Sequence, residues 1–291
     1  MALSSKYRLL REGKWKLLVQ PAQWSRELWE EVLRQSAGTA RGEIHPETKQ
    51  FCYPQGKKGR EYYLKIYHRS HPFGTIKDLF RQSKSFRALK QGLALAEHGF
   101  HAPFAVAAGE ERDCRLLKRA FLLTVRIDGS SIPFYLREHH AVPLSLPALR
   151  EKRDSLKKLA LEIGRLHRLG FVHGDLVPSN IFVRTEEKGV SFFYMDNDRT
   201  WRYPVWLFQR LWMRNLVQLN RFVLPGVSLQ DRMRFLKSYL GDKTWGRKER
   251  RLARQLEKRT RERRLECDRI AAQVSFRELM RWNGPFTRNI Q

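Results

Sequence analysis

Alternation of apolar and polar residues in the first 126 positions indicates a small lobe rich in strands. The clearest segment is EYYLKIYH at residues 61–68, which places Leu64 and Ile66 on one face of a strand and Lys65 on the other. Lys65 is therefore a cation inside an otherwise aromatic and aliphatic strand. The glycine-rich stretch that precedes it is typical of short hairpins.

Helical periodicity appears twice in the same region. Residues 23–33 show a short helical pattern, and residues 75–98 fit a longer helix. Two further strands are expected at residues 101–109 and 119–125, with a turn from Gly109 to Asp113 between them. Strands, one long helix and more strands together predict a small α+β lobe.

After residue 146 the pattern changes to that of helices. Residues 146–170 keep their apolar side chains close to one stripe, and residues 204–224 repeat this pattern with arginines on the other side. The second segment fits a core helix of a second lobe, and its Trp and Arg content also fits a helix at a membrane interface. Between them, residues 171–183 predict a loop that leads into a hairpin.

These patterns predict an α+β chain with three parts. We expect a β-rich N-terminal lobe at residues 1–126, a mainly helical C-terminal lobe at residues 127–245, and a basic helical segment at residues 246–291. Within the last part, residues 247–269 carry eleven Lys or Arg and five Asp or Glu.

The charge balance predicts an anionic partner. Lys and Arg number 57 against 30 Asp and Glu, which gives a net charge of +27 on 291 residues that are still 42% apolar. The apolar share excludes a wholly disordered basic chain, and the charge favours nucleic acid, a phosphate-bearing ligand or an anionic membrane. The three cysteines are too far apart in sequence to indicate a disulfide framework or a zinc site. Because the sequence has no run of about 18 apolar residues, we expect a cytoplasmic or peripheral protein.

A group of polar residues with a distinctive spacing carries the candidate chemistry. Asp175 and Asn180 follow His173 closely and stand just before an apolar run. Asp196 ends the next apolar run. Phosphoryl transfer from ATP needs a carboxylate for the attacking hydroxyl, and a carboxylate and an amide oxygen to hold magnesium on the phosphates. A strand lysine such as Lys65 completes the set, because its charge neutralises phosphate oxygens.

Together these residues resemble those of the protein-kinase-like superfamily, and within it the bacterial lipopolysaccharide kinases that phosphorylate heptose or Kdo (3-deoxy-octulosonic acid) in the inner core. The resemblance spans residues 50–240 and rests on YYLKIYH, EHGFHAPFAVAAGE, AFLLTV, IGRLHRLGFVHGDLVPSNIFV and YMDNDR. It implies a two-lobed kinase fold, with adenine near the backbone of residues 126–129. It also implies a role for each matched residue: Asp175 as the catalytic carboxylate, Asn180 and Asp196 as magnesium ligands, Lys65 as the ATP contact, and His173 and Asp198 as supporting residues.

The sequence departs from the protein-kinase pattern in ways that bear on the acceptor. Gly174 stands where protein kinases have Arg, Val177 stands where they have the catalytic-loop Lys, and Asp-Asn-Asp at residues 196–198 replaces Asp-Phe-Gly. Phosphoregulated kinases use that Arg to order an activation segment that also cradles a peptide. A small-molecule or glycolipid hydroxyl is therefore a better acceptor than a protein side chain.

Another departure concerns the partner of Lys65. The helix expected at residues 75–98 should offer a Glu to this lysine, but Ala88 occupies the matching position. The only acids of this helix are Asp78 and Glu97, near its ends. The sequence therefore leaves open what pairs with Lys65.

Three functions remain open at this point. The leading hypothesis is an ATP- and Mg²⁺-dependent kinase, peripheral on the cytoplasmic face of the inner membrane, that phosphorylates a sugar hydroxyl of lipid-linked core oligosaccharide. A kinase for a soluble amino sugar fits less well, because such cationic acceptors favour acidic pockets and the chain is strongly basic. A basic kinase-like scaffold without turnover is the third hypothesis, which the missing Glu favours and the retained acids oppose. A nucleic-acid partner is not expected, since no recognition motif accompanies the charge.

Overall fold

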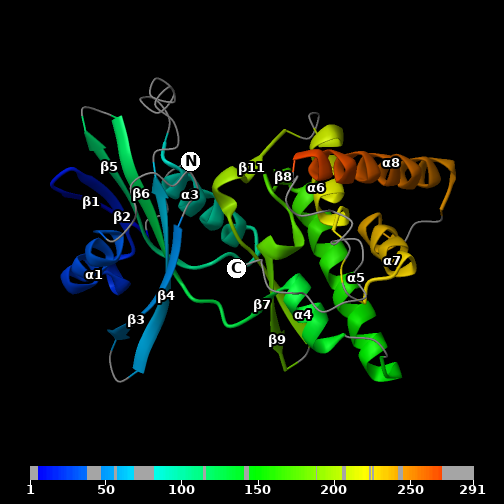
Figure 1. Ribbon diagram of the computed structural model, residues 1–291, viewed down its shortest axis with the longest axis horizontal. Coiled ribbons are helices and arrows are strands. Elements are labelled where there is room, and N and C mark those ends of the chain that lie inside the picture. The colour runs from blue at the N-terminus through cyan, green and yellow to red at the C-terminus, as the bar shows by residue number, and fades with distance from the viewer. Residues whose placement is uncertain are drawn as a thin grey trace. The chain divides into compact units, whose positions relative to one another are not determined.

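The computed structural model shows two compact units (Figure 1). The first unit comprises residues 1–128 and 194–199, and the second comprises residues 129–193 and 200–291. The structure describes residues 6–37, 47–55, 58–68, 82–113, 116–140, 144–187, 189–204, 208–222, 224, 226–241 and 245–270.

The first unit is built on a six-stranded antiparallel sheet with the strand order β1-β2-β5-β6-β4-β3. Its strands are β1 (Arg8–Glu12), β2 (Trp15–Val19), β3 (Glu47–Gln55), β4 (Lys58–His68), β5 (Ala105–Asp113) and β6 (Leu116–Val125). Strand β4 buries Leu64 and Ile66, as its alternating sequence predicts. Lys65 lies between them in sequence and is only partly buried.

Two helices use different faces of this sheet. Helix α1 (Arg26–Ala37) shares a core with Leu17 of β2, whereas helix α3 (Lys84–Glu97) shares a core with Leu18, the next residue. Successive strand residues point to opposite faces, so these adjacent leucines belong to separate cores. Three rings on the α1 side have centroids 5.5 to 5.9 Å apart: Trp15, Trp29 and Phe121.

The predicted turn between the two later strands is wrong. Strand β5 runs through residues 109–113, where it pairs with both β2 and β6. Gly109 is a packing position, because a Cβ atom there would lie 2.2 Å from a ring carbon of Phe121. The glycine that suggested a turn is needed for the close approach of an aromatic ring.

The predicted helix at residues 75–98 begins later than expected. Helix α3 starts at Lys84, since the hydroxyl of Ser83 accepts the backbone N–H of Phe86 and caps the first turn. Residues 69–81, which include Asp78, lie outside the described part of the chain. The helix ends at Glu97, and Gly99 follows its C-cap as predicted, with a φ of +72°, the left-handed conformation that glycine adopts readily.

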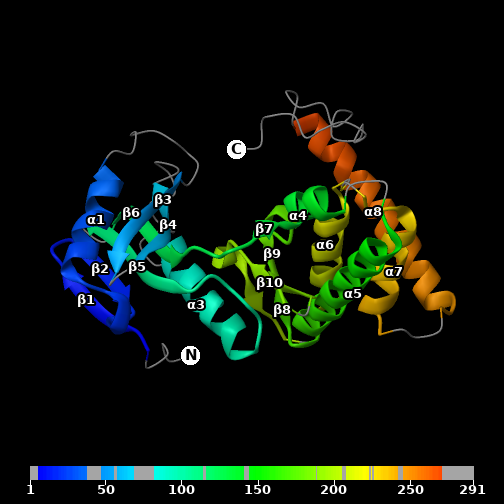
Figure 2. The same ribbon diagram turned by 90° about the horizontal axis from the view of Figure 1, so that it is seen from below.

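The second unit is mainly helical (Figure 2). Its helices are α4 (Ile132–His139), α5 (Leu146–Arg168), α6 (Phe208–Asn220), α7 (Leu229–Tyr239) and α8 (Arg247–Ile270). Helix α6 buries Met213, Leu216 and Val217, which is the burial expected of a core helix. No helix in the described ranges combines the length and apolarity that crossing a membrane requires.

A buried ion pair joins α5 to α7. The ammonium of Lys152 lies 2.9 Å from a carboxylate oxygen of Asp231, and both side chains are at most 5% exposed. The Lys152 ammonium also donates to the backbone oxygen of Gly226. Asp231 closes a capping box with Ser228 at the start of α7, so one carboxylate serves both the helix end and the ion pair.

Short strands complete the second unit and position the predicted loop. They are β7 (Ser130–Ser131), β8 (Phe171–Val172), β9 (Ile181–Glu186), β10 (Gly189–Tyr194) and β11 (Trp201–Arg202). Strands β9 and β10 form the predicted hairpin and β7 adds to β9, while β8 pairs with β11. Gly129 lets the chain approach β9, because a Cβ atom would lie 2.5 Å from the backbone oxygen of Val183.

Candidate active site

A tight loop between β8 and β9 brings Asp175 and Asn180 together. The loop folds back because the N–H of Val177 donates to the oxygen of Asp175, and the N–H of Asn180 donates to the oxygen of Val177, each at 2.9 Å. The side-chain amide of Asn180 then donates to the backbone oxygen of Asp175 at 3.0 Å and to its carboxylate at 3.3 Å. Two predicted site residues are thus neighbours in space.

His173 holds the start of this loop from inside the core. Its side chain is fully buried, and its Nδ1 accepts the backbone N–H of Asp175 at 3.2 Å. Its backbone N–H donates to Oδ1 of Asn215 on α6 at 3.0 Å, and the amide nitrogen of Asn215 donates back to the His173 oxygen. His173 therefore supports the loop through its shape and hydrogen bonds.

The same helix contributes a residue that the sequence analysis missed. Gln218 lies with its amide nitrogen 3.3 Å from both a carboxylate oxygen of Asp175 and the backbone oxygen of Gly174. Asn215 was missed as well, although it follows Leu211 and Trp212 at helical spacing and so falls on the apolar stripe. A polar residue at an apolar position was the available signal.

Lys65 on β4 pairs with Asp196. Its ammonium lies 2.6 Å from a carboxylate oxygen of Asp196. It also lies 5.5 Å from the ring centroid of Tyr67, two residues along the same strand. On α3, Ala88 is buried and Glu97 is exposed, so the partner of this lysine comes from beyond the helix. This pair answers the question that the missing Glu raised.

A second carboxylate lies near the Lys65–Asp196 pair. Asp198 is 7% exposed, and burial together with the charge of Asp196 raises its pKa. Burial and the same two carboxylates raise the pKa of Tyr67, whose hydroxyl has no hydrogen-bond partner within the described ranges. Asp196 itself has a φ of +54°, a conformation uncommon outside glycine and often found at functional positions.

The predicted site residues fall into two groups. Lys65, Asp196 and Asp198 belong to the first unit, and His173, Asp175 and Asn180 belong to the second. Within the described part of the chain, no group of three or more His, Cys, Asp or Glu side chains has an arrangement that could hold a metal ion.

Comparison with protein families identifies the chain. The model of the lipopolysaccharide kinase (Kdo/WaaP) family matches residues 39–239. The chain belongs to this family. Its members are kinases, so the protein is a phosphotransferase, as predicted. No curated protein sequence matches the chain.

The fold of this kinase is similar to that of a solved WaaP structure. The structure described as WaaP in complex with acyl carrier protein is similar with a TM-score of 0.57 and 19% identity, over 88% of this chain and 98% of that chain. A mutant kinase domain of PknI from Mycobacterium tuberculosis matches with a TM-score of 0.39 and 12% identity, over 89% of this chain and 100% of that chain. The predicted protein-kinase-like α+β fold is confirmed.

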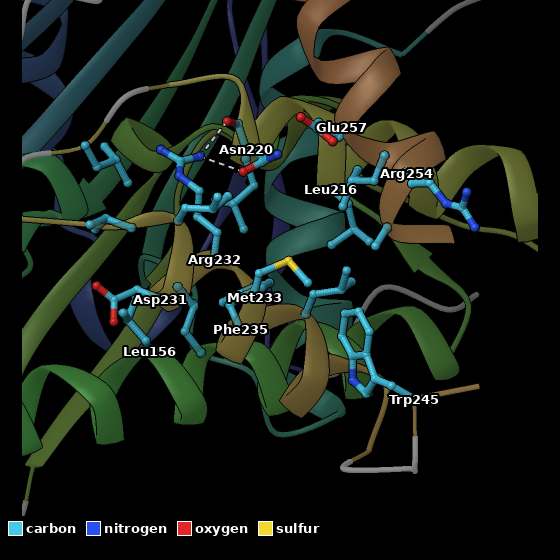
Figure 3. Close-up of a pocket in the computed structure, with 18 of the residues that line it drawn as sticks. Leu156, Leu216, Asn220, Asp231, Arg232, Met233, Phe235, Trp245, Arg254 and Glu257 are labelled. Carbon is cyan, nitrogen blue, oxygen red and sulfur yellow. Dashed lines mark hydrogen bonds between the residues drawn. The ribbon is translucent and has the colours of Figure 1, made fainter. Parts of the chain in front are cut away.

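The second unit of the kinase also contains an apolar pocket of about 490 Å³ (Figure 3). Helices α5, α6, α7 and α8 line it, mostly with aliphatic and aromatic side chains, and Figure 3 shows Met233 of α7 turned toward Leu216 of α6. Arg250 and Arg254 of α8 are also among its lining residues. The pocket is therefore mostly apolar, and its charged lining residues include the acids Asp231 and Glu257 as well as the arginines.

A third arginine that lines this pocket, Arg232, lies close to Arg264. Arg232 lines it and donates to the backbone and side-chain oxygens of Asn220, as the dashed lines of Figure 3 show. Burial and the charge of Arg264 lower the pKa of Arg232 to about 10. Both arginines donate to backbone oxygens near the C-terminal end of α6: Arg232 to those of Asn220 and Phe222, and Arg264 to those of Asn220 and Arg221.

Proposed function

We propose that this kinase transfers the γ-phosphoryl group of ATP to a hydroxyl of an inner-core lipopolysaccharide sugar, heptose or Kdo. The observation that carries the proposal is the pairing of Asp175 with Asn180 on one tight loop. A carboxylate beside an amide is the combination that phosphoryl transfer uses to receive a hydroxyl and to hold magnesium.

Asp175 is proposed to accept a hydrogen bond from the sugar hydroxyl and to orient its oxygen toward the γ-phosphorus. A bond forms between the sugar oxygen and that phosphorus, and the bond from the phosphorus to the β–γ bridging oxygen breaks. ADP leaves, and the proton of the hydroxyl passes to Asp175 and then to solvent. Lys65 is proposed to neutralise phosphate oxygens, a role that needs the fixed position its Asp196 partner provides.

The acids of the first unit fit a divalent cation. Asp196 pairs with Lys65 and lies near Asp198, and the raised pKa of Asp198 reflects burial and repulsion by Asp196. The amide nitrogen of Asn180 is engaged by Asp175, which leaves its oxygen as the ligand atom. We propose Asn180 and Asp196 as the ligands of Mg²⁺, which would neutralise charge on the phosphates when bound.

The strong positive charge supports a phosphorylated glycolipid as acceptor. A net charge of +27 favours an acidic surface and disfavours a cationic amino sugar. Each Lys or Arg near an anionic bilayer contributes about 1 kcal/mol to binding, so peripheral attachment to the cytoplasmic face of the inner membrane is part of the proposal. Sedimentation with anionic vesicles, lost at high salt, would test the attachment.

The proposal is tested by transfer of labelled phosphate from ATP to lipopolysaccharide taken from a host strain without this gene. Asp175→Asn keeps the shape of the side chain and removes the acceptor charge, so we expect a loss of about 10²–10⁴-fold in kcat. Asp154→Asn, on an exposed position of α5, is the matched control and should keep full activity. Full activity of Asp175→Asn, or no transfer by the unaltered kinase, would contradict the proposal. Mass spectrometry of the product identifies the sugar.

We further propose that the apolar pocket of the second unit receives an acyl chain presented by a partner. Its volume of about 490 Å³ lies in the common range for small ligands, and its lining is mostly aliphatic and aromatic. A similar structure contains an acyl carrier protein, which supports such a protein as the partner. The basic face of α8 would favour a carrier protein that has an acidic surface beside its acyl group.

Native mass spectrometry of the kinase mixed with acylated or unacylated carrier protein tests this partner. We expect the acylated form to bind at least tenfold more tightly. Met233→Trp should weaken that preference by filling the pocket, while Leu161→Trp, an exposed position on α5, should not. Equal binding of the two carrier forms would contradict an acyl site in the pocket.

A further inference from the structure

Gln218 contacts the carboxylate of Asp175, and the sequence pattern does not predict this contact. We propose that Gln218 is a positioning residue, whose amide fixes the orientation of the Asp175 carboxylate toward the acceptor hydroxyl. This inference rests on the proposed role of Asp175. It goes further by naming a residue on α6, remote in sequence from the loop, as part of the transfer machinery.

The direction of each amide in this contact follows from its neighbours. The N–H of His173 can only donate, so the atom of Asn215 that faces it is the oxygen. The nitrogen of Asn215 then donates to the oxygen of Gln218 at 3.2 Å. The nitrogen of Gln218 therefore faces Asp175 and Gly174, where both neighbouring atoms are acceptors.

A buried chain of hydrogen bonds holds Asn215 in that orientation. Nε2 of His167 lies 3.1 Å from the Asn215 oxygen, and Nδ1 of His167 lies 2.8 Å from the hydroxyl of Tyr239. Burial lowers the pKa of His167 to about 4, so the ring is neutral, donates from Nε2 and accepts from Tyr239. Every polar atom that sets the Gln218 position is thus satisfied from within the second unit.

Gln218 and Asn180 donate hydrogen bonds to different oxygens of the Asp175 carboxylate. Gln218 donates to Oδ1 of Asp175, and Asn180 donates to Oδ2, each at 3.3 Å. Two fixed donors on different oxygens restrict rotation of the carboxylate about its terminal bond. The position where protein kinases have the catalytic-loop Lys is the buried Val177 in this chain, and the donor arrives from α6 instead.

Three variants separate positioning from packing. Gln218→Met keeps the volume and removes both the donor and the acceptor of the side-chain amide, and Gln218→Glu keeps the acceptor for Asn215 but removes the donor to Asp175. Both should lower kcat by about 10–100-fold with the KM for ATP within twofold, as is common when a supporting hydrogen bond is lost. Gln218→Lys restores a donor and should recover kcat to within about fivefold of the unaltered kinase. Gln230→Glu, exposed on α7, is the matched control for the new charge.

The assay uses lipopolysaccharide from a host strain without the gene, with the melting temperature of each variant measured in parallel. Loss of kcat in Gln218→Met and Gln218→Glu at an unchanged melting temperature, with recovery in Gln218→Lys, supports the inference. Unchanged kcat in folded Gln218→Met and Gln218→Glu overturns it. Equal loss in all three variants, which indicates packing alone, also overturns it. An active Asp175→Asn variant signals a different failure, that of the proposed function itself.

Discussion

The Lys152–Asp231 pair allows a quantitative test of what stabilises the second unit. Lys152→Met leaves the buried Asp231 carboxylate with donors from Ser228 and from the partly exposed Arg234. Asp231→Leu leaves the buried ammonium with only the Gly226 oxygen among the described residues, and removes the helix cap as well. Breaking a buried pair on one side costs about 3–5 kcal/mol, so we expect Lys152→Met near the lower end and Asp231→Leu near the upper end.

The melting temperature measures this difference. At about 2–4 °C per kcal/mol for a unit of this size, the single variants should melt about 6–20 °C below the unaltered kinase. The double variant should be more stable than the sum of the single effects predicts, because it buries no unpaired charge. Lys157→Met, an exposed position on α5, is the control and should change stability by less than about 0.5 kcal/mol. Additive single effects would refute the argument.

Three other outcomes follow from the structure. Lys65→Met should raise the KM for ATP and lower kcat in the transfer assay, because the phosphate oxygens then lose the cation proposed to neutralise them; unchanged kinetics would remove Lys65 from the site. Burial lowers the pKa of His167 from about 6.5 to about 4 in the folded kinase. The contribution of His167 to the free energy of unfolding is therefore full above about pH 6.5 and decreases by up to about 3 kcal/mol as the pH drops toward 4. Melting curves across this range should show that slope, and His167→Gln should abolish it. Gly109→Ala should destabilise the sheet by about 1–3 kcal/mol in chemical denaturation, since its Cβ meets Phe121; a neutral result would mean that the ring can move aside.

The spacing of apolar residues predicted strands and helices correctly where one face of the element is buried. The alternation around Leu64 and the apolar stripe of α5 both gave the correct element, because each depends on one face of a strand or helix. The turn predicted at Gly109 was wrong for a physical reason: glycine suits a turn and a close contact with an aromatic ring equally well. Only the position of Phe121 across the sheet distinguishes them.

The sequence predicted some contacts among the candidate site residues and not others. The spacing of Asp175 and Asn180 gave their proximity, since five positions on one loop keep them near. The partner of Lys65 could not be found the same way, because Asp196 is 131 positions away in sequence. Gln218 was hidden by its helix, whose apolar and basic residues dominate the pattern.

The passage of residues 194–199 into the first unit has a practical consequence for dissecting the protein. The polypeptide crosses from one unit to the other three times, after residues 128, 193 and 199. A fragment that ends at Asp128 would keep Lys65 and lose Asp196, and its complement would carry Asp196 without the strand that neutralises it. No single cut therefore yields two intact halves, and separate study of either unit requires a spliced gene that carries residues 194–199 with the first 128.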